Sequence, residues 1–267
     1  VPLVVTVHDV VPHSDRFASR HAFLRRFYHV PQRLIVHYEA GRREMAEVYD
    51  LPEARIDVIP HGLVDAPSPP SRQEARRRLE IPESAEVVLF FGSIRENKGL
   101  DVLIRSFARI REARPSATLA IAGHPYREVD WSEYESLIDS SGIRDCTRTA
   151  IGFVPEDLID TWYAAADVVA LPYTRFGSQS GVLLRAYAHG KPVVVTRVGA
   201  MGEQVEADAV GEVVEPGDQQ ALADATVRLL GNLSEYEAPY ASGVAEKYSW
   251  RRIAEKTLET YKAASRA

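Results

Sequence analysis

The chain alternates short runs of apolar, often β-branched residues with segments of helical spacing, and few folds accept such a pattern. Two of the runs, VVLFFG at 87–92 and ATLAIAG at 117–123, are hydrophobic at nearly every position. A strand of this kind is covered on both faces, as in a parallel sheet flanked by helices. The sequence therefore predicts an α/β fold built on parallel sheets.

The same pattern places the other elements. Further strands are expected at residues 2–7, 33–37, 56–60, 149–152, 167–173, 192–196 and 211–214, and helices at 99–115, 155–167, 181–192 and 249–264. In the last helix, the apolar residues Trp250, Ile253, Leu258 and Tyr261 are expected to anchor it to a core.

A domain boundary is predicted at DAPSPPSRQE, residues 65–74, which has three prolines and two serines between structured segments. Only three strands precede it, and three parallel strands make a poor independent core. We therefore expect residues 1–65 to be the later part of an α/β domain whose opening strands are missing. Residues 66–245 would form a second α/β domain, and residues 246–267 a helix that packs back on the first.

Composition excludes several function classes. The chain has 267 residues and a formal net charge of −6, which argues against a broad nucleic-acid surface. The basic cluster Arg76–Arg78 is interpreted as a solvated helix face. The single cysteine, Cys146, excludes an intramolecular disulfide and fits a reducing compartment. No apolar run approaches the length of a membrane span.

The loop FFGSIRENKGL, residues 90–100, places two cations between two glycines directly after a strand. Gly92 and Gly99 permit a tight turn, while Arg95 and Lys98 can bind phosphate oxygens. Ligands of open α/β sheets bind at the carboxyl ends of the strands. On these residues alone, an exposed basic loop tip and a phosphate site remain equally good interpretations.

A second loop, in the segment LPYTRFGSQSGVLLRAYAHGKPVVVT at 171–196, follows another buried strand and opens a helix near Ser180. Ser178 or Ser180 can cap this helix. Backbone N–H groups of Ser180, Gly181 and Val182 would then point outward at its positive end. Both loops should open on the same sheet edge, and a diphosphate needs the cations of one and the dipoles of the other.

With these segments in place, the sequence resembles the retaining glycosyltransferases of family 4 (glycosyl transferases group 1), which have the two-domain GT-B fold. The resemblance rests on four stretches: IDVIPHG, FFGSIRENKGLDVLI, GFVPEDLIDTWYAAADVVALPY and GSQSGVLLRAYAHGKPVVVTRVG. They occur in the family's order with compatible spacing. The resemblance implies that residues 1–65 belong to the acceptor-side domain and residues 66–245 bind a nucleotide-sugar donor.

The resemblance also implies roles for single residues. Arg95 and Lys98 would neutralise the diphosphate, within a segment that includes Gly92 and Ser93. Ser178, Ser180, Gly181 and Val182 belong to the turn that holds the distal phosphate, and Gly152, Phe153 and Val154 to the stretch that lines the base pocket. His8 matches a histidine that faces the transferred sugar. His13 lies nearby, but without a third ligand we expect no metal.

Two positions depart from the family pattern. Two glutamates eight residues apart usually bracket the signature turn, and here Gly177 and Arg185 occupy these positions. Arg185 cannot accept hydrogen bonds from ribose hydroxyls as a glutamate does. Three interpretations remain: Arg185 recruits a phosphate, it pairs with a nearby acid, or it marks weakened nucleotide binding. Ser93 stands where many relatives have an arginine, a role that Arg95 can take over.

The function implied is transfer of a sugar from a nucleotide-diphosphate donor to a hydroxyl of a glycan, lipid or small molecule, with retention of anomeric configuration. No cofactor, metal or nucleic acid is implied. We expect a cytoplasmic protein at or near the inner face of the membrane, with any membrane contact made by the missing N-terminal part. The alternatives are a degenerate, non-catalytic GT-B module that binds a partner chain or a nucleotide, and a nucleotide-sugar epimerase.

Overall fold

The computed structural model describes residues 1–10, 18–63, 69–177 and 179–266, which divide into two compact units. The first comprises Val1–Leu63, Gly177–Ser180 and Ala245–Ala267, and the second comprises Val64–Phe176 and Gly181–Val244. Of the predicted boundary segment, residues 65–68 lie outside the described ranges, whereas residues 72–74 already belong to the first helix of the second unit. Inclusion of Gly177–Ser180 in the first unit was not indicated by the sequence.

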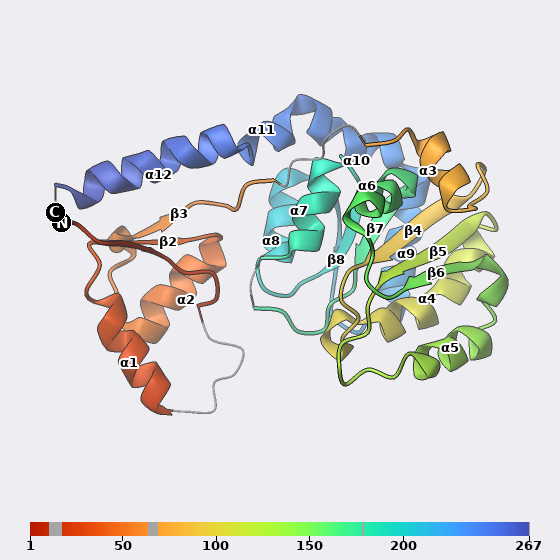
Figure 1. Ribbon diagram of the computed structural model, residues 1–267, viewed down its shortest axis with the longest axis horizontal. Helices are drawn as coiled ribbons and strands as arrows, with labels where there is room; N and C mark the ends of the chain where they lie inside the picture. The colour runs from red at the N-terminus through yellow and green to blue at the C-terminus, as the bar shows by residue number, and fades with distance from the viewer. Residues whose placement is uncertain (11–17, 64–68, 178, 267) are drawn as a thin grey trace. The chain divides into compact units, whose positions relative to one another are not determined.

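The first unit is a three-stranded parallel sheet covered on both faces (Figure 1). Its elements are β1 (Val4–Thr6), α1 (Ala18–Tyr28), β2 (Arg33–Val36), α2 (Glu39–Tyr49), the 3₁₀ turn η1 (Glu53–Arg55), β3 (Ile56–Val58), α11 (Ala245–Lys247) and α12 (Trp250–Ala264). Leu34 and Val36 of β2 pack into a cluster with α1 and α2, whereas Ile35 points to the other face and packs with Ile253 of α12. The strand alternation therefore decides which helices cover which face.

The second unit contains a six-stranded parallel sheet in the order β6-β5-β4-β7-β8-β9. Its strands are β4 (Glu86–Phe91), β5 (Ala117–Gly123), β6 (Thr147–Ile151), β7 (Val168–Leu171), β8 (Val193–Thr196) and β9 (Gly211–Val214). Its helices are α3 (Arg72–Arg78), α4 (Leu100–Ala113), α5 (Trp131–Ser140), α6 (Glu156–Ala165), α7 (Gly181–Ala188), α8 (Met201–Asp208), α9 (Gln219–Gly231) and α10 (Leu233–Pro239), with short turns η2 (Glu96–Lys98), η3 (Arg144–Cys146) and η4 (Tyr240–Val244).

From β4, the sheet extends on one side through β5 to β6, and on the other side through β7 and β8 to β9. This is the doubly wound order in which the chain reverses between β4 and β7, and ligands of such sheets bind at that reversal. Every residue of β5 is buried, because helices cover both faces (Figure 1). The α/β fold with parallel sheets predicted from the apolar runs is confirmed.

Two sequence expectations about single residues are wrong. Arg76 is 1% exposed, so the cluster Arg76–Arg78 is not a uniformly solvated face; only Arg77 and Arg78 are exposed. In α12, Ile253 is buried, but Trp250, Leu258 and Tyr261 are half-exposed. The buried face of α12 runs through Ile253, Thr260 and Ala264, and Leu258 and Tyr261 fall outside that helical stripe.

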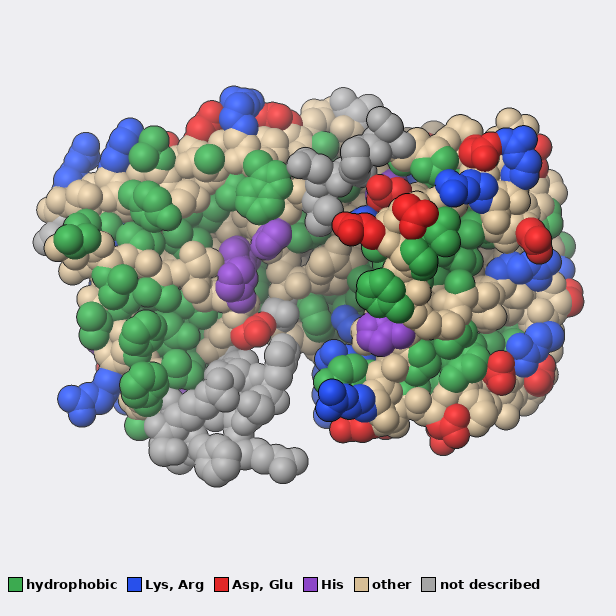
Figure 2. Space-filling model, viewed as in Figure 1, with side chains coloured by type: hydrophobic (Ala, Val, Ile, Leu, Met, Phe, Trp, Pro, Cys, Tyr) green, Lys and Arg blue, Asp and Glu red, His purple; other side chains and the backbone are tan. Residues whose placement is uncertain are grey.

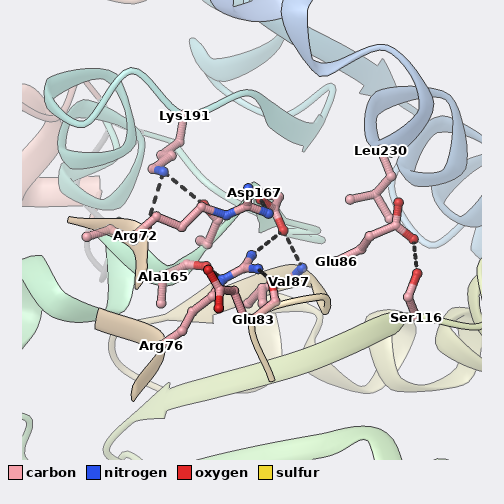
Figure 3. Close-up of polar contacts among 12 residues, drawn as sticks. Arg72, Arg76, Glu83, Glu86, Val87, Ser116, Ala165, Asp167, Lys191 and Leu230 are labelled. Atoms are coloured by element: carbon pink, nitrogen blue, oxygen red, sulfur yellow. Dashed lines mark hydrogen bonds and ion pairs between the residues drawn. The ribbon is translucent and has the colours of Figure 1, made fainter. Parts of the chain in front are cut away.

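Arg76 is buried because it meets Asp167, the residue that precedes β7 (Figure 3). Its Nη2 donates to Asp167 Oδ2 at 2.6 Å, its Nε to the Ala165 carbonyl at 3.1 Å, and its Nη1 to the Glu83 carbonyl at 2.6 Å. Asp167 also accepts from the backbone N–H of Val87 at 2.7 Å. The pair joins α3, the end of α6 and the starts of β4 and β7.

Removal of Asp167 is expected to destabilise the second unit strongly. Asp167→Ala leaves the Arg76 guanidinium buried without a counter-charge, which costs about 3–5 kcal/mol. Arg72 also pairs with Asp167 at 2.6 Å but is half-exposed, so Arg72→Ala should cost only about 0–1 kcal/mol. Urea denaturation of both variants measures the difference, and equal losses would show that burial of the pair is not what matters.

Candidate functional site

The loops after β4 and after β7 meet at the carboxyl edge of the six-stranded sheet. Backbone Thr174 N–H donates to the Asn97 carbonyl at 3.0 Å, and the Asn97 side chain donates to the Arg175 carbonyl at 3.0 Å. Gly99 lies against Pro172, and Gly92 faces the side chain of Val182 in α7. The structure thus brings together the two segments that the sequence singled out separately.

Gly99 is required at the junction of the two loops. Its φ is +66°, and a Cβ there would lie 1.9 Å from the Pro172 carbonyl oxygen. This close approach allows η2, which holds Lys98, to end directly beside the β7 loop. α4 begins with the next residue, so one glycine both starts the helix and admits the neighbouring backbone.

Lys98 lies in an aromatic enclosure supplied by the β7 loop. Its Nζ is 3.6 Å from the ring centroid of Tyr173 and 4.4 Å from that of Phe176. Ring faces attract the ammonium group, but partial burial removes it from water. Burial first, and the charge of Arg95 second, lower the pKa of Lys98 to about 8. Among the described residues, Lys98 is paired with aromatic rings and with no carboxylate.

Arg95 is exposed and stacks on an aromatic ring as well. Its Cζ is 3.9 Å from the ring centroid of Tyr126, in the loop that follows β5, and its Nε donates to Ser93 Oγ at 3.3 Å. Stacking orients the planar guanidinium while leaving its outer N–H groups available. The sequence did not single out Tyr126, Tyr173 and Phe176 as partners of these cations. The available signal was that all three are aromatic residues in loops just after predicted strands.

The first turn of α7 lies next to this cationic pair through the Gly92–Val182 contact. The helix begins at Gly181, as the sequence predicted near Ser180. Gly181 is exposed and a Cβ there would meet nothing within 4 Å, whereas Ser180 is buried. Ser178 lies outside the described residues. A helix start whose first residue is exposed, close to the loop of Arg95 and Lys98, is a favourable geometry for binding an anion.

Glycines line the ends of the three strands on the β6 side. Gly92, Gly123 and Gly152 all have positive φ, and the Gly152 N–H donates to the Gly123 carbonyl at 2.9 Å. At Gly123 a Cβ would lie 1.7 Å from the Gly92 carbonyl oxygen. Of the residues assigned to the base pocket, Gly152 and Val154 are partly buried and Phe153 is 86% exposed.

Arg185 pairs with an acid, which is one of the three interpretations that the sequence left open. Its Nη1 lies 2.9 Å from Asp160 Oδ1 of α6, and both side chains are about one-fifth exposed. The same oxygen lies 3.0 Å from His189 Nε2. Burial lowers the pKa of His189, although the contact with Asp160 opposes that effect. Asp160 was not singled out in the sequence.

His8 lies in the first unit, after β1, and its exposed ring contacts His37. Among the described residues, no group of three or more histidine, cysteine, aspartate or glutamate side chains has the geometry to hold a metal ion. His13 lies outside those residues. In the described ranges every helix is too short or too polar to cross a bilayer.

Comparison with known proteins identifies the family. Residues 85–232 match the family described as Glycosyl transferases group 1, and residues 1–66 match the one described as Glycosyltransferase Family 4. The chain belongs to the glycosyl transferases group 1 family. The first match covers most of the six-stranded sheet, including the loops of Arg95 and Lys98 and the start of α7.

Similar proteins of known sequence agree with this assignment. A D-inositol 3-phosphate glycosyltransferase of Corynebacterium urealyticum is 35% identical over 86% of this chain and 56% of its own length. An uncharacterised glycosyltransferase of Methanocaldococcus jannaschii is 33% identical over 84% of this chain and 58% of its own length. The chain therefore spans a little over half of these relatives.

Two solved structures have similar folds. HepE of Anabaena in complex with UDP has a TM-score of 0.85 at 21% identity, covering 98% of this chain and 72% of its own. Sucrose-phosphate synthase of Thermosynechococcus elongatus has a TM-score of 0.77 at 21% identity, covering 97% and 67%. These neighbours are GT-B glycosyltransferases, so the predicted GT-B fold is confirmed.

Gly99→Ala is expected to damage this site more than an equally strained glycine elsewhere. Gly142 has nearly the same φ, +67°, but open space around it, so Gly142→Ala should cost only the backbone strain of about 1–2 kcal/mol. Gly99→Ala adds the collision with Pro172 and should cost about 3 kcal/mol or more. Thermal unfolding of both variants measures this, and similar losses would refute the close packing of the two loops.

Anion binding at Lys98 should depend on pH. The ammonium form binds the anion, and binding raises the pKa of Lys98 above its free value of about 8. Relative to a variant whose cation does not titrate, affinity for inorganic pyrophosphate should therefore be constant below that value and fall as pH rises through it, by at most about tenfold per pH unit.

Lys98→Arg provides the matched control, because a guanidinium stays charged throughout this range. Calorimetric titrations of both proteins between neutral and alkaline pH give the two profiles. An identical decline in the Arg variant would assign the pH dependence to another group.

Proposed function

We propose that this chain is the donor-binding and adjoining part of a retaining glycosyltransferase that transfers a sugar from a nucleotide-diphosphate donor to a hydroxyl acceptor. The observation that carries the proposal is the convergence of Arg95, Lys98 and the open start of α7 at the sheet's reversal point. Membership in the glycosyl transferases group 1 family supports it. Structures of HepE with UDP and with UDP-glucose support a uridine donor in particular.

In the proposed reaction the donor's glycosidic C–O bond to the diphosphate breaks while the acceptor oxygen bonds to the anomeric carbon on the same face. Negative charge builds on the departing diphosphate. Arg95 and Lys98 neutralise it, and the backbone N–H groups of Ser180, Gly181 and Val182 hold its distal phosphate. The departing diphosphate takes the acceptor's proton, so no pair of catalytic carboxylates is needed.

The remaining roles follow the resemblance described above. Gly152, Phe153 and Val154 would line the base pocket, and the exposed Phe153 ring offers a stacking surface. His8 would contact the transferred sugar. Arg185 is assigned to the nucleotide site together with Asp160, which fixes the position of its guanidinium. The proposed acceptor is a glycan, lipid or small-molecule hydroxyl, and the proposed location is the cytoplasm, at or near the inner membrane face.

A second candidate is a non-catalytic module that binds a nucleotide or a partner chain. The Arg185–Asp160 pair favours it, because the arginine occupies the position of an acceptor glutamate and is itself engaged by an acid. Gly177 replaces the other glutamate. Binding without transfer would distinguish this candidate from the enzyme.

Calorimetric titration of the chain with UDP, GDP and ADP tests the donor site. We expect saturable binding of one nucleotide, weakened about 10–100-fold in Arg95→Ala and in Lys98→Ala, since each variant loses charge-assisted contacts. Arg109→Ala is the matched control, because this arginine is exposed and lies in the later part of α4, away from the loop of Arg95 and Lys98.

Equal weakening in Arg109→Ala would show a general charge effect instead of a site. If one nucleotide binds as expected, the chain is next supplied with nucleotide-sugar donors and hydroxyl acceptors. Proton NMR of the product then reports the anomeric configuration. Inversion would exclude the retaining mechanism, and binding with neither transfer nor hydrolysis would favour the non-catalytic module.

A further inference from the structure

Three residues at the carboxyl ends of β1, β2 and β3 form a hydrogen-bonded row in the first unit. His8 follows β1, His37 follows β2 and Ile59 follows β3, in the spatial order of the sheet. His37 Nδ1 lies 2.9 Å from the Ile59 carbonyl oxygen, and His37 Nε2 lies 3.0 Å from His8 Nδ1. Histidine side chains group on the molecular surface in this unit (Figure 2).

The row fixes the position of each proton. A carbonyl oxygen only accepts, so His37 Nδ1 must carry the proton of its contact with Ile59. The Nε2 of a neutral His37 is then a bare acceptor, and the proton between the two rings must belong to His8 Nδ1. A neutral His8 that donates from Nδ1 has a lone pair on Nε2.

We propose that His37 is a positioning residue that holds His8 in the Nδ1–H tautomer, so that His8 Nε2 accepts a hydrogen bond from a ligand hydroxyl. That this hydroxyl belongs to the transferred sugar rests on the function proposed above. The tautomer itself follows from the contacts of the first unit alone. His8 is exposed, and its Nε2 makes no hydrogen bond within the described part of the chain.

Packing holds the His37 ring in this role. The His61 ring contacts it edge to face, with centroids 5.9 Å apart, and Trp250 contacts His61 in the same way at 5.5 Å. His61 Nδ1 is held by the Gly62 carbonyl at 2.8 Å, and a Cβ on Gly62 would collide with the Trp250 ring. This stack restricts rotation of His37 away from His8.

The same surroundings keep His37 neutral. Partial burial is the largest influence and lowers its pKa, the Ile59 carbonyl opposes this, and the neighbouring His8 and His61 lower it further. A doubly protonated His37 would reverse the direction of the hydrogen bond and place a proton on His8 Nε2. The environment disfavours that arrangement, so His8 presents an acceptor instead of a donor.

Nitrogen-15 NMR of the histidine-labelled chain tests the tautomer, with the His8 signals assigned by their loss in His8→Gln. The spectra are recorded at mildly alkaline pH, where histidines are neutral. We expect His8 to be protonated at Nδ1. In His37→Phe it should revert to the Nε2–H form that free histidine favours, whereas His37→Gln, whose amide oxygen can accept the same proton, should retain Nδ1–H.

His29→Gln is the matched control, because His29 is a histidine of the same unit that also pairs with a backbone carbonyl, that of Tyr49 at 3.1 Å. It should leave the His8 tautomer unchanged. Protonation of His8 at Nε2 in the unaltered chain would overturn the proposal, and so would retention of Nδ1–H in a folded His37→Phe variant.

Titration with UDP and UDP-glucose tests the ligand hydroxyl separately. His37→Phe should weaken binding of UDP-glucose about tenfold, the value of one hydrogen bond, and leave binding of UDP unchanged. Equal weakening of both ligands would overturn the role in sugar contact. If the unaltered chain binds neither ligand, the proposed function fails for this chain, while the tautomer measurement still decides the role of His37.

Discussion

The ion pair between Arg76 and Asp167 anchors the two strands on which the candidate site depends. Asp167 precedes β7 and accepts from Val87 at the start of β4, so one carboxylate ties together the amino ends of both central strands (Figure 3). The loops of Arg95 and of Tyr173 leave the opposite ends of the same strands. Register between β4 and β7 at one edge therefore determines whether the cations and the α7 start meet at the other.

The two cations of this site, Arg95 and Lys98, form no ion pair with a carboxylate among the described residues. Several arginines of the second unit are paired with carboxylates, as Arg114 is with Glu86. Lys98 and Arg95 instead lie on aromatic rings, which orient a cation without cancelling its charge. Partial burial beside these rings lowers the pKa of Lys98, and a bound anion would raise that pKa again. Fixed cations and the start of a helix are both general means of electrostatic stabilisation.

The sequence predicted what depends on local pattern and missed what depends on distant partners. Apolar runs located the strands, and the Gly/Ser turn located the start of α7, because burial period and turn chemistry are local. Arg76 was misinterpreted because its burial depends on an aspartate 91 residues later. The aromatic partners of Lys98 were missed for the same reason: they come into contact only when the β4 and β7 loops meet. The roles of the site residues stay predictions until ligands are measured.

The row of glycines at the ends of β4, β5 and β6 bears on how binding of the proposed ligand could be altered. Where side chains line a pocket, substituting them alters its shape and hydrogen-bonding groups. Here the wall nearest the strand ends is main chain, and Gly123 admits no Cβ beside the Gly92 carbonyl. The groups that could form hydrogen bonds there are backbone N–H and C=O groups, and their positions are set by the course of the main chain. If a ligand binds at these strand ends as proposed, changing its selectivity at Gly123 would require a different loop path, because no side chain can be accommodated there.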